Sequence, residues 1–317
     1  MSILGPLNPA KFMAHTSVDY KKLEWIQIEN VGAKDIEYLA KRFNFHPLDL
    51  EDCLSNKQHT KIDSYDDYNF MVLQFPHKKR GDGHLGHNEV DIFISDRYLV
   101  TINHGNKALR KLAKKVNENA DLQKKYFGHG TGYLLYKVFK RLVNESFDVL
   151  TYVETQLTSL EKRVFATDSN RDCLQEILLL KKDIIHFRRI MVNQWELLQE
   201  LMQKRFSFVT KKLLVYFDDL NDGVVKISNS LELAKEMISA IQETNESMIS
   251  HNTNDVIKAL TFISVIMLPL TVITGIYGMN IATLPFAESP NSFLIITGLM
   301  VVVITLMLSF FKFRRWF

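Results

Sequence analysis

A short segment near the C-terminus combines residue types that suit the capture of a hydrated cation. Gly278, Met279 and Asn280 lie between two long apolar stretches. Asn280 carries a carboxamide oxygen, and glycine at 278 lets the backbone turn and approach a common axis. Mg2+ prefers oxygen ligands and sheds its water reluctantly, so a ring of carboxamide and carbonyl oxygens could hold the ion through its water shell. A ring of carboxylates would risk binding too tight for rapid release.

A stripe of small and polar residues runs along the apolar stretch before this segment. Steps of three and four residues place its members on one face of a helix; they are Asn254, Thr261, Ser264, Thr271, Gly275 and Gly278, with Ile257 and Leu268 at the two remaining positions. Small residues allow close packing of membrane helices, but a polar face also suits a pore wall. One helical hairpin encloses no pore, so conduction would need a homo-oligomer, most simply a cyclic one.

Two stretches are long and apolar enough to cross a bilayer. Residues 259–287 and 289–311 carry no charged side chain, and Glu288 alone separates them. A helix rises about 1.5 Å per residue, so about 20 residues cross a hydrocarbon core of about 30 Å. We therefore expect a first transmembrane helix with its motif at 259–280, an external loop at 281–291, and a second transmembrane helix with a basic tail at 292–317.

The distribution of basic residues predicts the orientation of this hairpin. Lys258 precedes the first span, the loop at 281–291 contains no Lys or Arg, and a basic cluster follows the second span, namely Lys312, Arg314 and Arg315. The positive-inside rule then places both termini in the cytoplasm. Trp316 suits an interfacial anchor. The expected location is the cell inner (plasma) membrane.

The segment before the first span has a heptad-like seam. Its apolar residues alternate at steps of four and three: Leu213, Phe217, Leu220, Val224, Ile227, Leu231, Ala234, Ile238 and Ile241, with Asn245 and Met248 in the same register. This spacing predicts a long helix packed against other helices. No proline occurs before Pro269, so we expect one helix from about residue 210 to about residue 277, roughly 100 Å long. Residues 210–258 would form a stalk.

The N-terminal part predicts a cytoplasmic α/β domain at 1–105. Strands are expected at 23–28, 68–75, 89–95 and 98–103, and helices at 33–43 and 46–54. Strand signals end at residue 106. Long helices at about 133–165 and 172–205, joined by a polar turn at 167–170, predict a helical layer at 106–209.

Composition excludes several other classes of protein. The net charge is +3, and no basic run is interleaved with aromatic residues, which argues against nucleic acid as a partner. Cys53 and Cys173 lack CxxC spacing and suit reduced structural thiols. No nucleophile elbow, Walker motif or HExxH occurs, so an enzyme is not expected.

The sequence of the first span resembles the signature of the CorA family of magnesium channels. The matching run is PLTVITGIYGMN at 269–280, followed by a second span and a basic terminus. The soluble part is similar too, in HPLDLEDCL at 46–54 with Gln58 and Lys61 after it, in YLLY at 133–136 and in YFDD at 216–219. The resemblance extends from about residue 20 to the end of the chain.

This resemblance implies an α+β multi-domain membrane protein that forms a funnel-shaped homopentamer. It implies uptake of Mg2+ down its electrochemical gradient, with Co2+ or Ni2+ as additional cargo. The selectivity filter would be Gly278, Met279 and Asn280. The pore lining would include the polar positions Asn254, Thr261, Ser264, Thr271 and Gly275, and Ile257, Leu260 and Leu268 as hydrophobic constrictions that gate by dewetting.

The resemblance also implies a cytoplasmic Mg2+ sensor between subunits. Its two carboxylates match Asp52 and Asp219, with Glu51 and Asp222 as neighbours. Two carboxylates that face each other repel unless a cation lies between them. High cytoplasmic Mg2+ would thus favour a closed symmetric state, and low Mg2+ would loosen the ring.

Two alternatives stay open. A zinc transporter of the same superfamily would share the architecture; Met279 favours Mg2+, and His84, His87 and His129 lack the accompanying acids or cysteines of a zinc site. A membrane-tethered scaffold could use the seam for assembly and conduct nothing. The external loop also has Phe286 after Pro285, where many family members carry an acid.

Overall fold

The computed structural model describes residues 15–55, 58–79, 84–166, 171–280, 284–286 and 289–314. The chain divides into two compact units, Met1–Glu243 and Thr244–Phe317, here called unit 1 and unit 2. The predicted turn at 167–170 lies outside the described residues, as do Glu288, Arg315 and Trp316.

Unit 1 contains a six-stranded sheet in the order β1-β2-β6-β5-β4-β3. The strands are β1 His15–Tyr20, β2 Leu23–Glu29, β3 Lys61–Ser64, β4 Asn69–Lys78, β5 Leu85–Ile94 and β6 Tyr98–Asn103. β2 and β6 pair in parallel, and the other neighbours pair antiparallel. The predictions for β2, β4, β5 and β6 are confirmed. β1 and β3 were not expected.

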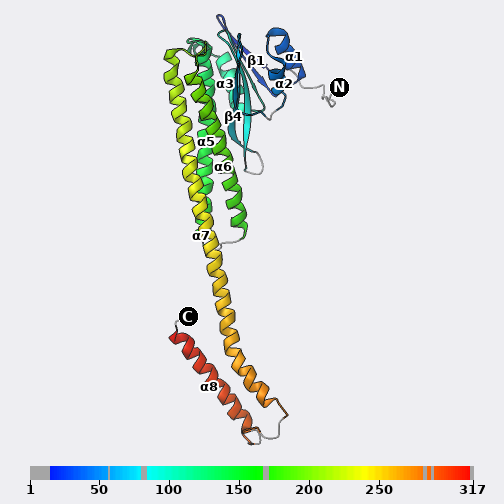
Figure 1. Ribbon diagram of the computed structural model, residues 1–317, viewed down its shortest axis with the longest axis vertical. Coiled ribbons are helices and arrows are strands. Elements are labelled where there is room, and N and C mark those ends of the chain that lie inside the picture. The colour runs from blue at the N-terminus through cyan, green and yellow to red at the C-terminus, as the bar shows by residue number, and fades with distance from the viewer. Residues whose placement is uncertain are drawn as a thin grey trace. The chain divides into compact units, whose positions relative to one another are not determined.

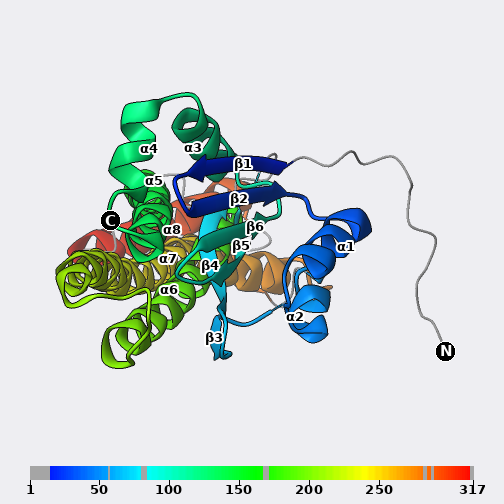
Figure 2. The same cartoon turned by 90° about the horizontal axis from the view of Figure 1, so that it is seen from above.

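The two faces of the sheet pack against different helices (Figures 1 and 2). α1 (Ala33–Arg42) and α2 (Pro47–Asp52) cover one face, over a core that includes Ile26, Phe70 and Phe93. The long helices α5 (Thr131–Phe165) and α6 (Arg171–Gln203) cover the other. Alternation along each strand supplies both cores, because successive side chains point to opposite faces.

Two short helices precede the long ones. α3 (Lys107–Asn117) and α4 (Ala120–Phe127) each begin at an asparagine side chain that accepts backbone N–H bonds, Asn106 for α3 and Asn119 for α4. α5 and α6 confirm the predicted helices at 133–165 and 172–205 within two residues at each end.

α7 (Lys211–Tyr277) is one continuous helix of 67 residues that passes through Pro269, as expected. In unit 1 its seam is covered: every predicted apolar position from Leu213 to Ile241 is buried. Further along the same register, in unit 2, Asn245 is buried and Met248 is partly buried. The seam therefore supplies one wall of the helical core.

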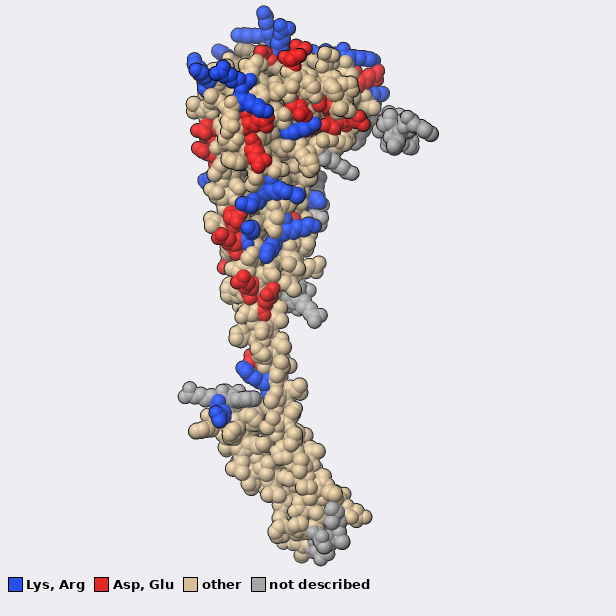
Figure 3. All heavy atoms as spheres, viewed as in Figure 1, with Lys and Arg blue, Asp and Glu red and all other residues tan. Residues whose placement is uncertain are grey.

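Unit 2 contains the C-terminal part of α7 and α8 (Ser292–Phe313). Both helices are long and apolar enough to cross a membrane. The space-filling view shows charged side chains spread over the visible face of unit 1, whereas the described residues of the apolar stretches at 259–287 and 289–311 carry none (Figure 3). The chain thus combines an N-terminal α/β domain, a long helix and two candidate transmembrane helices.

Candidate functional site

The polar stripe lies on an uncovered face of α7. Among its predicted members only Thr261 is partly buried; the others are exposed, namely Asn254, Ile257, Leu260, Ser264, Leu268, Thr271, Gly275 and Gly278. Ile257 and Leu268 expose 55% and 67% of their surface. The fold of unit 2 therefore leaves these side chains without cover from its own helices.

α8 packs against the opposite face of α7. The partly buried residues of α7 after Thr261 are Phe262, Ile266, Pro269, Leu270, Ile273 and Tyr277. Phe262 contacts Phe311 of α8 edge to face, with 5.1 Å between the ring centroids. At about 100° per residue, this face is centred roughly 180° from the polar stripe. The small and polar residues of α7 therefore do not mediate its packing against α8.

Two hydroxyl groups on the stripe donate hydrogen bonds back to their own helix. Ser264 Oγ donates to the Leu260 carbonyl at 2.9 Å, and Thr271 Oγ1 donates to the Met267 carbonyl at 2.9 Å. A hydroxyl that donates its proton in this way still has acceptor lone pairs. The stripe therefore presents hydrogen-bond acceptors, which suit the water shell of a cation.

The Gly-Met-Asn segment follows the last turn of α7 directly. The Gly278 N–H donates to the Thr274 carbonyl at 2.8 Å, and the Met279 N–H donates to the Ile276 carbonyl at 3.2 Å. A Cβ at position 278 would lie 3.1 Å from the Thr274 carbonyl oxygen, so glycine relieves crowding at this turn. Met279 and Asn280 are exposed beyond it.

Asp52 is the last residue of α2 and is held by two donors. Gln58 Nε2 donates to Asp52 Oδ1 at 2.8 Å, and Lys61 Nζ donates to Asp52 Oδ2 at 3.0 Å. Its side chain is 24% exposed. Glu51, the preceding residue, is exposed. The carboxylate is thus accessible and fixed in direction.

α2 itself is anchored to the connection between β3 and β4 through Asp49. Tyr68 Oη donates to Asp49 Oδ2 at 2.9 Å, and Tyr65 Oη donates to Asp49 Oδ1 at 3.1 Å. The His46 N–H donates to Tyr68 Oη at 2.8 Å just before Pro47 begins the helix. Burial raises the pKa of Asp49, and the two tyrosine hydrogen bonds oppose that effect. These contacts fix the position from which Asp52 projects.

Asp219 lies near the start of α7 and is 60% exposed. Lys140 Nζ on α5 donates to Asp219 Oδ2 at 2.9 Å and to Tyr136 Oη at 3.0 Å. Asp222 is exposed one turn further along α7. In both views of unit 1, α2 and the first turns of α7 lie on opposite sides of the sheet (Figures 1 and 2). Asp52 and Asp219 of one copy therefore do not share an ion.

Two buried acids below α2 were not anticipated from the sequence. Glu89 and Asp91 alternate along β5 on the face that α2 covers, and both are fully buried. The Gln58 N–H donates to Glu89 Oε2 at 3.0 Å. Burial raises the pKa of Glu89 to about 7, and burial together with Glu89 raises that of Asp91 strongly. Two acids at alternate positions beside the apolar residues of the predicted strand at 89–95 were the signal available in the sequence.

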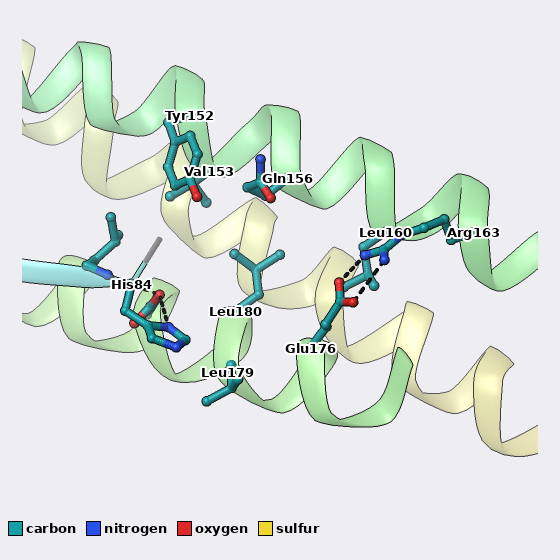
Figure 4. Close-up of a pocket in the computed structure, with 11 residues that line it drawn as sticks. His84, Tyr152, Val153, Gln156, Leu160, Arg163, Glu176, Leu179 and Leu180 are labelled. Carbon is teal, nitrogen blue, oxygen red and sulfur yellow. Dashed lines mark hydrogen bonds and ion pairs between the residues drawn. The ribbon is translucent and has the colours of Figure 1, made fainter. Parts of the chain in front are cut away.

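A pocket of about 270 Å3 lies among α5, α6 and the start of β5 (Figure 4). Val153, Leu160 and Leu180 line it, and Arg163 forms a two-pronged ion pair with Glu176 at one end. His84 Nδ1 lies 3.4 Å from Asp183 Oδ2 at the other end. Its charged groups thus pair with each other. Within the described residues, no three His, Cys, Asp or Glu side chains are grouped to hold a metal ion.

Comparison with known proteins agrees with this architecture. The profile of the family described as CorA-like Mg2+ transporter proteins matches residues 20–315. YfjQ of Bacillus subtilis is 29% identical over 307 residues, which cover 95% of this chain and 92% of that protein. The cobalt/magnesium transport protein CorA of Thermotoga maritima is 26% identical over 294 residues, covering 92% of this chain and 83% of that protein.

A solved structure extends the agreement to three dimensions. The complete CorA magnesium transporter from Methanocaldococcus jannaschii superposes with a TM-score of 0.83 at 25% identity, covering 100% of this chain and 96% of that one. The match includes the α/β domain, the long helix and both apolar helices. The chain belongs to the family of CorA-like Mg2+ transporter proteins.

Proposed function

We propose that this protein is a homopentameric channel that conducts Mg2+ into the cytoplasm down its electrochemical gradient. The observation that carries the proposal is the polar stripe of α7, which faces away from α8 and ends at Gly278, Met279 and Asn280. Several copies around an axis would turn this stripe inward, away from lipid. Family membership supports a divalent cation as cargo, with Co2+ or Ni2+ as additional ions.

In the proposed pore, each class of stripe residue has a separate role. Asn280 and the backbone at Gly278 form the outer ring of oxygens that contacts the hydrated ion, and Met279 completes this filter. Asn254, Thr261, Ser264, Thr271 and Gly275 offer small or polar surface. Ile257, Leu260 and Leu268 form rings of apolar side chains, which close the pore by excluding water. Residues 259–280 are thus the proposed pore-lining helix, preceded by a stalk at 210–258.

The proposed orientation places both termini in the cytoplasm of a cell whose plasma membrane holds the two helices. Lys258, Lys312 and Arg314 support this orientation, because basic residues favour the cytoplasmic side. The proposed divisions of the soluble part are the α/β domain at 1–105 and the helical layer at 106–209. Residues 281–291 form the proposed external loop, and 292–317 the second span with its tail.

We further propose that cytoplasmic Mg2+ regulates the channel between subunits. Carboxylate oxygens are suitable ligands for Mg2+. α2, which ends at Asp52, and the first turns of α7, which include Asp219, lie on opposite sides of the sheet (Figures 1 and 2), as contacts to two different neighbours require. Glu51 and Asp222 stand beside them. The carboxylates of adjacent copies repel each other unless a cation lies between them, so the bound state would favour a closed symmetric ring.

Mg2+ flux into liposomes tests the conduction pathway. Asn280→Ala should abolish uptake of Mg2+ into dye-loaded liposomes and leave the pentamer intact by size-exclusion chromatography with light scattering. Asn291→Ala is the matched control, because Asn291 is exposed before α8 and its side chain makes no capping hydrogen bond. Normal uptake by Asn280→Ala would remove this residue from the filter.

The same assay separates the alternatives. A wild-type protein that passes no Mg2+ under a gradient and a membrane potential would favour the scaffold. Zn2+ uptake driven by a pH gradient, without Mg2+ uptake, would favour a zinc transporter.

A further inference from the structure

Each acid of the proposed regulatory site already holds an ammonium group from its own chain. Lys61 on β3 donates to Asp52 at 3.0 Å, and Lys140 on α5 donates to Asp219 at 2.9 Å. The two pairs involve four different elements and lie on opposite sides of unit 1. The fold therefore makes the same arrangement twice, once on each surface that would meet a neighbouring copy.

Both lysines have a second partner that would keep them in place without the acid. Lys61 Nζ lies 2.9 Å from Asp63 Oδ2 and 5.3 Å from the centroid of the Phe70 ring. Lys140 Nζ donates to Tyr136 Oη at 3.0 Å and lies 5.5 Å from the centroid of that ring. Either ammonium can therefore leave its proposed regulatory carboxylate and still keep a contact with another group of the protein.

Both lysines also stay charged at neutral pH. The ordinary pKa of a lysine ammonium lies about three units above neutral pH. A permanent positive charge therefore lies against each carboxylate, where it repels an approaching cation.

On the basis of the regulatory site proposed above, we propose that Lys61 and Lys140 are tethered counterions, displaced from Asp52 and Asp219 by a divalent cation. They thereby set the Mg2+ concentration at which the site fills. An ammonium on a carboxylate oxygen occupies a ligand position and neutralises its charge. Mg2+ must compete with it, so the site fills only at a higher ion concentration than a bare pair of carboxylates would need.

The two lysines should differ in how strongly they compete with Mg2+ for their carboxylates. Asp52 is 24% exposed and Asp219 is 60% exposed, and water and salt screen an exposed pair more strongly. Loss of Lys140 should lower the Mg2+ midpoint of the site about two- to fivefold, the range for an exposed ion pair. Loss of Lys61 should lower the midpoint by at least as much.

Limited proteolysis of the full-length pentamer in detergent measures this midpoint without relying on transport. Mg2+ is titrated against digestion by endoproteinase Glu-C, because Lys→Met and Asp→Asn substitutions leave its cleavage sites after glutamate unchanged. Lys140→Met and Lys61→Met should both shift protection to lower Mg2+. Lys140→Arg, which keeps the charge, should stay close to wild type.

Lys137→Met is the matched control. Lys137 lies one turn before Lys140 on α5, and its Nζ is 4.9 Å from the centroid of the Tyr133 ring and 5.1 Å from that of Tyr136. The substitution changes the net charge equally but removes no contact with Asp219, so its midpoint should stay within about twofold of wild type, as expected for a screened surface charge.

The outcomes separate this inference from the proposed regulatory site. If wild type shows no Mg2+-dependent protection, or Asp219→Asn protects as wild type does, the regulatory site itself is wrong. If Asp219→Asn abolishes protection while Lys140→Met matches Lys137→Met, the site stands and the tethered counterions do not. A thermal unfolding curve shows whether Lys61→Met is folded. If Lys61→Met is unfolded, the comparison of Lys140→Met with Lys137→Met alone tests the proposal.

Discussion

The two parts of α7 have similar residue spacing but opposite surroundings. In unit 1, residues at steps of three and four form an apolar seam that the chain's own helices bury completely, as at Phe217 and Ile227. In unit 2, residues at the same steps form a polar stripe that the chain leaves exposed, opposite the face that meets α8. The first seam stabilises the fold of one copy. The second is not covered by α8 within one copy, which supports the proposal that it lines a pore in an assembly.

The strongest test of this contrast places the same residue change in both parts. Ile227 is fully buried, and Ile257 is 55% exposed. Ile227→Asn should destabilise unit 1 by about 3–5 kcal/mol, because it replaces buried apolar surface with an amide that lacks partners. Ile257→Asn should leave the melting temperature of the proposed pentamer unchanged and increase Mg2+ flux in liposomes, because it wets a proposed constriction. Equal destabilisation by both substitutions would contradict the contrast.

Two glycines provide a second matched pair. A Cβ at Gly132 would overlap the carbonyl oxygen of Phe208 and lie 2.9 Å from Leu213 Cδ1, whereas a Cβ at Gly275 would meet nothing within 4 Å. Gly132→Ala should destabilise unit 1 by about 1–3 kcal/mol through overpacking. Gly275→Ala should leave thermal unfolding unchanged and reduce Mg2+ flux, because the added methyl group narrows the proposed pore.

Gly298→Ala on α8 controls for the membrane environment, since its Cβ would also meet nothing within 4 Å. Its flux should match wild type. If Gly298→Ala and Gly275→Ala reduce flux equally, the effect of Gly275→Ala does not report on the stripe.

Unit 1 also contains acids whose pKa is raised by burial. Glu89 has a folded-state pKa of about 7, against an ordinary value of 4.5. Below about pH 4.5 both states hold the proton, so stability is unaffected; as pH rises towards 7 the unfolded state deprotonates first, and the folded state loses stability. Glu89→Gln should therefore stabilise the folded state at pH 8 by about 3 kcal/mol, which raises the melting temperature, and should leave the melting temperature unchanged at pH 4.

Glu51→Gln is the exposed counterpart on α2. Its melting temperature should follow wild type at both pH values. If Glu89→Gln does not raise the melting temperature at pH 8, ionisation of the buried Glu89 does not destabilise the fold. Buried and exposed acids would then contribute alike to the pH dependence of stability.

Sequence patterns predicted the long elements well because those elements depend on periodicity. The bounds of α7 and its buried seam follow from residue spacing alone, as do α5 and α6. β1 and β3 were missed because they are the edge strands: each pairs with one neighbour, and their sequences carry weak alternation. α2 ends at Asp52, two residues before the predicted end.

The candidate sites were less accessible to sequence reasoning. The stripe residues between positions 254 and 278 could be assigned to one face of α7 from the sequence. The direction of that face relative to α8 is known only from the structure. The ion pair of Lys140 with Asp219 joins residues 79 positions apart, and no local pattern signals such a contact. The raised pKa of Glu89 is caused by its burial beneath α2, and that burial is known only from the structure.

The back-bonded hydroxyls of α7 have a consequence for biogenesis. A newly inserted copy has no neighbours, so its stripe faces lipid, where an unsatisfied polar proton is costly. Ser264 and Thr271 give their protons to the carbonyls of Leu260 and Met267, so a lone hairpin can enter the bilayer without waiting for partners. Insertion and oligomer assembly can then occur as two separate steps, and in the proposed ring the same hydroxyl oxygens would become available to water.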